Sequence, residues 1–167
     1  LVRLGQQALR LVEQARVLER HAHARGEGGD ESLVRVAEGA WPGVGQDDDA
    51  GIQVCVQGLQ RLMPIAEKHG LKICLEYLNS KVDHKDYAFD RMRYGLEVVK
   101  GVGSPRMKIL YDIYHAQIME GDVIRTIRDH AASIGHYHTA GVPGRHEIDD
   151  GQELNYGAIC RAIVETG

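Results

Sequence analysis

The sequence predicts an α/β fold made of parallel βαβ units, and three observations support this class. From residue 47 onward, strand patterns alternate with helical patterns of about 10–15 residues. Polar residues occur near the carboxyl ends of the predicted strands. The chain has 167 residues, of which 43% are hydrophobic, so it can bury a core. The pattern fits a barrel or an open doubly wound sheet, although a closed (β/α)₈ barrel usually needs about 250 residues.

The alternation can be followed element by element. Apolar residues at helical spacing predict a first helix that begins near Ile52 and kinks at Pro64. Lys68 in its last turn and Gly70 just beyond predict where it ends. Short apolar runs predict three buried strands, and further helical patterns fill the intervals. The strands span 72–78, 107–113 and 134–140, and the other helices span 86–100, 123–131 and 156–163.

Residues 1–46 differ in composition from the rest of the chain. They contain no Lys, Tyr or Phe, whereas residues 47–167 contain all six Lys, all seven Tyr and the only Phe. An apolar stripe predicts a helix that runs to about His23, followed by a Gly-rich loop and a segment, 33–40, without a clear period. Residues 1–46 contain no motif that predicts a catalytic, binding or metal site, and we expect them to form an atypical N-terminal segment.

Composition and charge exclude several kinds of partner. The formal net charge is −4 and no Lys/Arg stripe occurs, so binding to nucleic acid is not expected. The absence of a run of 18 apolar residues predicts that nothing spans a membrane.

Three cysteines without CxxC spacing, Cys55, Cys74 and Cys160, are expected to be buried thiols. We therefore expect a cytoplasmic protein in a reducing compartment.

Each predicted strand carries polar residues where a parallel sheet should be apolar. These are Glu76, Asp112 and the pair His136 and His138. Because the carboxyl ends of parallel strands form the ligand face, we expect these side chains to converge on one site. Two carboxylates and an imidazole suit a divalent cation, Mg²⁺ or Mn²⁺ first, with Zn²⁺ or Co²⁺ admitted by the imidazole. Spacing alone leaves open which histidine reaches the centre, and structural roles remain an alternative.

Two further residues are candidates for substrate contact. His115 follows Asp112 by three residues, in the loop expected beyond the strand. Arg145 follows the tight loop Gly141–Gly144, and its guanidinium suits a carboxylate or phosphate. The polar loop 80–86 adds His84 and Lys85, for which solvation is an equal alternative.

At these residues the sequence resembles a known family. The segments LEYLNSKVDH, YDIYHAQIMEGD, IGHYHTAGVPGRHE and QELNY together resemble the hydroxypyruvate isomerase branch of the xylose-isomerase-like TIM barrels. The resemblance covers about residues 47–167 and implies an incomplete (β/α)₈ TIM barrel with a bound divalent metal. It implies these roles: Glu76 as metal ligand and proton-transfer carboxylate, Asp112 and His138 as metal ligands, His115 and Arg145 as substrate contacts, and His136 as a residue behind the ligands.

The implied reaction interconverts hydroxypyruvate and tartronate semialdehyde through an enediol. The same barrel serves ketose 3-epimerases and inosose dehydratases, which remain alternatives, and a metal-dependent apurinic endonuclease is disfavoured by the acidic charge. In the relatives a second Glu ligand lies on the strand after the QELNY helix, a strand that this sequence does not include, so we expect no complete site in this chain. Glu153 precedes that helix, where the resemblance places no ligand, and we interpret it as a helix-start residue. An inactive binding or vestigial fragment is therefore the second alternative.

The N-terminal part of the chain also departs from the family pattern, because residues 1–46 resemble none of the βα units that precede Glu76 in the family. We hypothesise that they derive from a shifted reading frame or a mis-joined gene model. An incomplete barrel leaves sheet edges unpaired, which predicts a chain that is marginally stable, aggregates, or is rescued by self-association into a homo-oligomer. The substrate is expected to be a small hydroxy or keto acid or a sugar.

Overall fold

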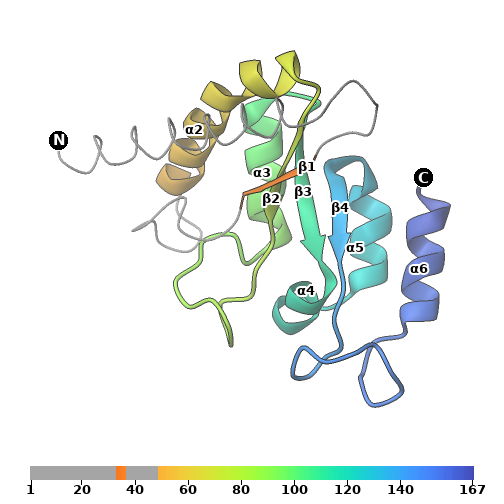
Figure 1. Cartoon of the computed structure of the whole chain (residues 1–167). Helices are drawn as coiled ribbons and strands as arrows, with labels where there is room; N and C mark the ends of the chain where they lie inside the picture. Colours follow the sequence, from red (N-terminus) through yellow and green to blue (C-terminus); the bar gives the residue numbers. More distant parts are fainter. Residues whose placement is uncertain (1–32, 37–48) are drawn as a thin grey trace.

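The structure, a computed structural model, describes residues 33–36 and 49–167 (Figure 1). These residues form one parallel four-stranded sheet in the order β1-β2-β3-β4. The strands are β1 (Leu33–Val36), β2 (Lys72–Glu76), β3 (Met107–Asp112) and β4 (Ile134–His138). The helices are α2 (Asp49–Lys68), α3 (Met92–Val102), α4 (Ile113–Met119), α5 (Val123–His130) and α6 (Tyr156–Glu165), with a 3₁₀ turn at Ala131–Ser133.

The predicted βαβ class is confirmed, and the strands are shorter than predicted at their carboxyl ends. β2, β3 and β4 stop at Glu76, Asp112 and His138, so each ends on one of the predicted metal ligands. The segment 33–40, which shows no clear period, contains β1, and β1 pairs in parallel with β2. The helix predicted up to about His23 and the Gly-rich loop lie outside the described residues. No helix in the described part is long and apolar enough to cross a membrane.

The first predicted helix is observed as α2, with the predicted end. It passes through Pro64 to Lys68, and Gly70 then adopts a left-handed conformation with φ of 63°. Its buried residues, among them Cys55, Leu59 and Ala66, recur at helical spacing and face the sheet and α3. The sequence pattern therefore predicts both the register and the end of this helix.

The second predicted helix begins too early. The prediction was 86–100, but α3 begins at Met92 and the preceding residues form a loop. Asp86 has a φ of 65°, which a right-handed helix does not accommodate. The first turn of α3 is capped from a distance, because the carboxylate of Glu120 accepts a hydrogen bond from the Met92 backbone N–H at 2.7 Å. A cap supplied 28 residues away leaves no local signal.

The two faces of the sheet differ in the side chains that they carry. Ile73, Leu75, Met107 and Ile109 alternate along β2 and β3 and pack into one apolar core with the helices. Residues of the opposite parity lie on the other face, and there the strand ends carry charged groups. Figure 1 shows the arrowheads of β3 and β4 pointing toward the end of the molecule where α4 and the loop after β4 lie. The fold thus places the polar residues on one face, at one end.

The cysteines divide into two buried thiols and one exposed thiol. Cys55 and Cys74 are fully buried as predicted, whereas Cys160 is exposed and the prediction of burial is wrong there. Ile159 faces the core from α6, and the next residue on a helix points about 100° away, toward solvent. All three cysteines are free.

We expect thiol labelling to report this division directly. Burial raises the pKa of Cys55 to about 12, so at pH 8 almost none of this thiol is the reactive thiolate. In the native chain one thiol should react with a disulfide reagent within minutes, and Cys160→Ser should abolish that fast phase. Fast labelling of Cys55 in a natively folded chain would contradict the packing of α2.

Candidate functional site

Three strand ends converge on one cluster of potential metal ligands. Glu76, Asp112 and His138 each offer one donor atom, and these atoms lie within 4.8 Å of one another. The register explains the convergence, because Asp112 of β3 is paired with His138 of β4, while Glu76 ends the neighbouring strand β2. Among the described residues, the structure brings together the three predicted ligands.

The two carboxylates of this cluster are buried, and the imidazole is partly open. Glu76 is 1% exposed and Asp112 is 3% exposed, whereas the His138 side chain is 36% exposed. The Nδ1 atom of His138 lies 3.3 Å from Oε1 of Glu76 and 3.7 Å from Oδ2 of Asp112. His138 therefore faces both carboxylates with one nitrogen atom.

The two carboxylate oxygens of Asp112 have different roles: one caps a helix and the other faces the cluster. Its Oδ1 accepts a hydrogen bond from the His115 backbone N–H at 3.2 Å, which caps the first turn of α4. Its Oδ2 faces His138 and the ring of His115. The helix thus fixes the carboxylate in the orientation that presents Oδ2 to the cluster.

The chemistry of this donor set fits a divalent cation. A cation with ligands at about 2.0–2.2 Å holds neighbouring donor atoms about 3 Å apart and opposite ones about 4 Å apart. The two separations from Nδ1 of His138, 3.3 Å to Glu76 and 3.7 Å to Asp112, fall in this range, and all three donor atoms lie within 4.8 Å of one another. Two buried carboxylates close together are costly without a positive charge between them. The cluster therefore has the residue types and spacing of a metal centre.

His115 lies beside the cluster, on a helix rather than in the loop that the sequence predicts. It is the third residue of α4, which begins directly after β3, and its ring is fully buried. Burial lowers the pKa of His115 to about 4, an effect that the nearby Asp112 opposes and Arg145 reinforces. The ring is therefore neutral near pH 7. The Asp112 cap and the apolar spacing of Ile113, Ala116 and Met119 are the signals that could have identified α4.

Arg145 approaches the site from the loop after β4. It has a φ of 59°, and its guanidinium carbon lies 5.5 Å from the centroid of the Tyr114 ring, next in sequence to His115. The Gly141 backbone pairs with His146 across this loop, with N–H···O at 2.7 Å, and an added Cβ at Gly141 would lie 2.4 Å from the Glu147 carbonyl oxygen. The close backbone approach at glycine holds the loop shape that presents Arg145.

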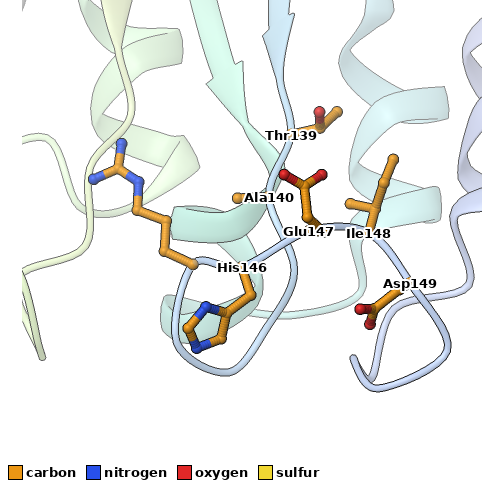
Figure 2. Close-up of a pocket in the computed structure, with 7 residues that line it drawn as sticks. Thr139, Ala140, His146, Glu147, Ile148 and Asp149 are labelled. Atoms are coloured by element: carbon orange, nitrogen blue, oxygen red, sulfur yellow. The ribbon is translucent and has the colours of Figure 1, made fainter.

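An open pocket of about 810 Å³ adjoins the end of β4. Figure 2 shows Thr139 and Glu147 on the strand side of this pocket and the His146 ring on the outer loop. The three cluster residues do not line it, but Arg145 does. The pocket therefore lies next to the cluster of Glu76, Asp112 and His138. Arg145, the predicted anion-binding residue, belongs to both the pocket and the candidate site. The residues that line it are Thr139, Ala140, Arg145, His146, Glu147, Ile148 and Asp149.

The remaining candidates lie at different distances from the cluster. His136 is exposed, pairs with Leu110 rather than Asp112, and has its ring 5.2 Å from that of His138, so it lies next to His138. Its place behind the ligands stays a prediction. Partial loss of solvent around its ring lowers the pKa of His136, as do the neighbouring His138 and Lys72. The polar loop 80–86 contributes one residue near the site: the His84 ring lies 5.1 Å from the His115 ring. Lys85 of the same loop is exposed.

The start of α6 corrects one detail of the prediction. Glu153 does not begin the helix: Asn155 is the N-cap, and its side chain accepts a hydrogen bond from the Ala158 backbone N–H. Glu153 instead accepts one from Gln117 of α4 at 3.1 Å. An Asn directly before Tyr156, the first residue of the predicted helix 156–163, is the signal that could have shown this.

Sequence reasoning missed a polar network that joins the buried His115 ring to Asn79 and to the exposed Asp83. Asn79 is fully buried, and its side-chain amide contacts the His115 ring and the carboxylate of Asp83. The Tyr114 hydroxyl also donates to Asp83, at 2.9 Å. Burial raises the pKa of Asp83, but the hydrogen bonds from Asn79 and Tyr114, together with the neighbouring His115 and His84, lower it more, so the pKa lies below its ordinary value. Asn79 lies within a polar loop sequence, so nothing in its spacing distinguishes it.

Comparison with known families identifies the class of protein. A family model for the xylose isomerase-like TIM barrel matches residues 8–167. The chain belongs to this family, and the expected fold class is confirmed. The match includes most of residues 1–46. The reading-frame hypothesis for that segment stays a prediction, to be tested on the nucleotide sequence that precedes Asp47.

Two of the curated relatives that match part of the chain are isomerases. A 2-oxo-tetronate isomerase of Cupriavidus necator is 42% identical over 102 residues, which are 61% of this chain and 38% of the relative. The hydroxypyruvate isomerase of Escherichia coli is 32% identical over 108 residues, 65% of this chain and 41% of the relative. The chain thus spans about two fifths of the length of these relatives, which are isomerases by name.

Solved structures show the same fold. A structure described as an AP endonuclease, family 2, from Brucella melitensis superposes with a TM-score of 0.82 at 26% identity, covering 95% of this chain and 58% of the other. A D-psicose 3-epimerase superposes with a TM-score of 0.74 at 24% identity, covering 95% and 53%. The second likeness shows the fold alone. The described sheet and helices therefore correspond to part of a TIM barrel.

Proposed function

We propose that the protein containing this chain is a metal-dependent isomerase of a short 2-oxo acid, and that it interconverts hydroxypyruvate and tartronate semialdehyde. The observation that carries this proposal is the cluster of Glu76, Asp112 and His138 at three adjacent strand ends. The isomerases among the curated relatives support the same class of reaction. This is the reaction implied by the family resemblance.

Each residue of the site has a task in this reaction. Asp112 and His138 would hold a divalent cation together with Glu76, and the bound cation would act as a Lewis acid toward the oxygens of the enediol. The reaction moves a proton from carbon 3 of hydroxypyruvate to carbon 2, and we assign a proton-transfer role to the Glu76 carboxylate. His115 donates a hydrogen bond to a substrate oxygen, and Arg145 pairs with the substrate carboxylate.

A second substrate is favoured by one relative. The 42% identical relative is a 2-oxo-tetronate isomerase, and that substrate also has a carboxylate, a 2-oxo group and a neighbouring hydroxyl. The same proton shift between carbons 3 and 2 applies to it. The two substrates differ in the group beyond carbon 3, so they share the contacts that we assign to this chain.

The test is turnover by the purified protein that contains this chain. Hydroxypyruvate, 2-oxo-tetronate, D-fructose and an inosose would be compared with Mg²⁺ or Mn²⁺ and after removal of metal with EDTA. We expect metal-dependent turnover of a 2-oxo acid. Turnover of the ketose or inosose without either 2-oxo acid would contradict the proposal, and metal binding without any turnover would favour an inactive binding fragment.

Arg145 gives a specific prediction for substrate binding. Arg145→Gln should raise KM for the 2-oxo acid about 10–100-fold, because a charge-assisted hydrogen bond to the substrate carboxylate contributes about 1.5–3 kcal/mol. Steady-state kinetics would measure this. Arg125→Gln, at an exposed position of α5, is the matched control and should leave KM unchanged. An unchanged KM in Arg145→Gln would remove this residue from the site.

A further inference from the structure

One buried nitrogen atom beside the metal-ligand cluster has no hydrogen-bond partner. It is Nε2 of His115, on a ring that is fully buried. The nearest charged group is Oδ2 of Asp112 at 3.8 Å, which is beyond hydrogen-bond distance. A buried polar atom without a partner is costly, so this nitrogen is placed to meet a group that enters the site.

The opposite nitrogen of the same ring is held by Asn79. The distance from Nδ2 of Asn79 to Nδ1 of His115 is 2.6 Å. Which atom donates depends on the orientation of the Asn79 amide and on the tautomer of the ring.

The surrounding backbone fixes the amide orientation. Oδ1 of Asn79 accepts hydrogen bonds from the backbone N–H groups of Val82 and Asp83, each at 3.0 Å. Nδ2 donates one hydrogen to Oδ2 of Asp83 at 2.8 Å. Exchanging the amide oxygen and nitrogen would set donors against donors and a carbonyl oxygen against a carboxylate. The second hydrogen of Nδ2 is therefore the one that points at His115.

This orientation determines the tautomer of His115. Nδ1 faces an amide N–H, so it must be the unprotonated acceptor, and the ring proton is on Nε2. We propose that Asn79 is a positioning residue that holds His115 in the Nε2–H tautomer, so that the ring presents a hydrogen-bond donor to an acceptor oxygen of the substrate. The Nδ1–H tautomer would place two donors against each other at 2.6 Å.

The inference narrows the chemistry of the ligand at this position. The substrate atom that meets Nε2 is an acceptor, such as the oxygen of a 2-oxo group or of the enediolate formed from it, and not a hydroxyl that must donate. This step rests on the proposed function. The tautomer itself does not, because it is a property of the chain without substrate.

Long-range ¹⁵N–¹H correlation spectra of the histidine side chains test the tautomer directly. The His115 signals are identified by their loss in His115→Gln. In the wild-type chain near pH 7 we expect Nε2 to be the protonated nitrogen, with at least about a tenfold excess over the other tautomer. A protonated Nδ1 would overturn the proposal, and this measurement requires no change at Asn79.

Two variants separate positioning from a general effect on the fold. In Asn79→Asp an oxygen replaces the donor that faces Nδ1, so the proton should move to Nδ1 and the tautomer ratio should reverse. Ser80→Ala, which removes a hydrogen bond to Asp90 in the same loop, should leave the wild-type tautomer unchanged. An unchanged tautomer in a folded Asn79→Asp chain, or a reversed one in Ser80→Ala, would overturn the role of Asn79. Failure of the proposed isomerase reaction would leave these spectra unchanged.

Discussion

Glu76→Gln is expected to weaken binding of Mn²⁺ to the chain at least about 100-fold, because it removes one of three ligands from strand ends. Loss of a supporting residue around a metal site typically costs about 10–100-fold in affinity, and loss of a ligand should cost more. In the complete enzyme the same variant also loses its proton-transfer carboxylate, so kcat should fall at least about 10³-fold.

Calorimetric titration with Mn²⁺ and thermal unfolding with and without the ion would measure the binding effect. Mn²⁺ at 100 times its Kd should stabilise the wild-type chain by about 2.7 kcal/mol. At this concentration Glu76→Gln should show a much smaller shift in Tm. Glu97→Gln, at an exposed ion pair with Arg93 on α3, is the matched control and should bind like wild type. Equal affinity in Glu76→Gln and wild type would rule out Glu76 as a ligand.

Glu120→Ala is expected to lower the free energy of unfolding by about 2–4 kcal/mol, although Glu120 is exposed. Its Oε2 accepts a hydrogen bond from the hydroxyl of Tyr77 at 2.7 Å and another from the Met92 backbone N–H at 2.7 Å. Tyr77 is fully buried, so truncation leaves its hydroxyl without this acceptor, and it also uncaps α3.

A double-mutant cycle separates these two contributions. Tyr77→Phe removes the buried hydroxyl, so Glu120→Ala should cost less in that background, by about 1–2 kcal/mol. Chemical denaturation of the four proteins would measure the difference. Glu165→Ala removes an exposed ion pair with Arg128 and should cost less than about 1 kcal/mol. Additive effects of Tyr77→Phe and Glu120→Ala would show that the hydrogen bond does not stabilise the fold.

The strands and the clustering of the three candidate ligands could be predicted because their signals are local. Buried parallel strands are continuous apolar runs, and Glu76, Asp112 and His138 interrupt those runs at their carboxyl ends. Since parallel strands end at one edge, sequence position translates directly into spatial proximity. The order β1-β2-β3-β4 follows the order of the chain, so no other strand lies between the three strands that carry the predicted ligands.

The parts that sequence reasoning missed depend on distant partners. The start of α3 is set by Glu120, which lies 28 residues away. The role of Asn79 depends on the ring of His115, 36 residues away, and on a loop that folds back onto its own amide. The exposure of Cys160 depends on how α6 rotates against the core. Such pairings become visible only once the sheet has placed the loops together.

The most direct test of the metal centre is the electron spin echo of Mn²⁺ bound to the chain. A histidine ligand gives a modulation from its coordinated ¹⁴N. We predict this modulation in the wild-type chain, its retention in His136→Gln and its loss in His138→Gln. A modulation that persists in His138→Gln, or that disappears in His136→Gln, would contradict the assignment of Glu76, Asp112 and His138 as the metal ligands.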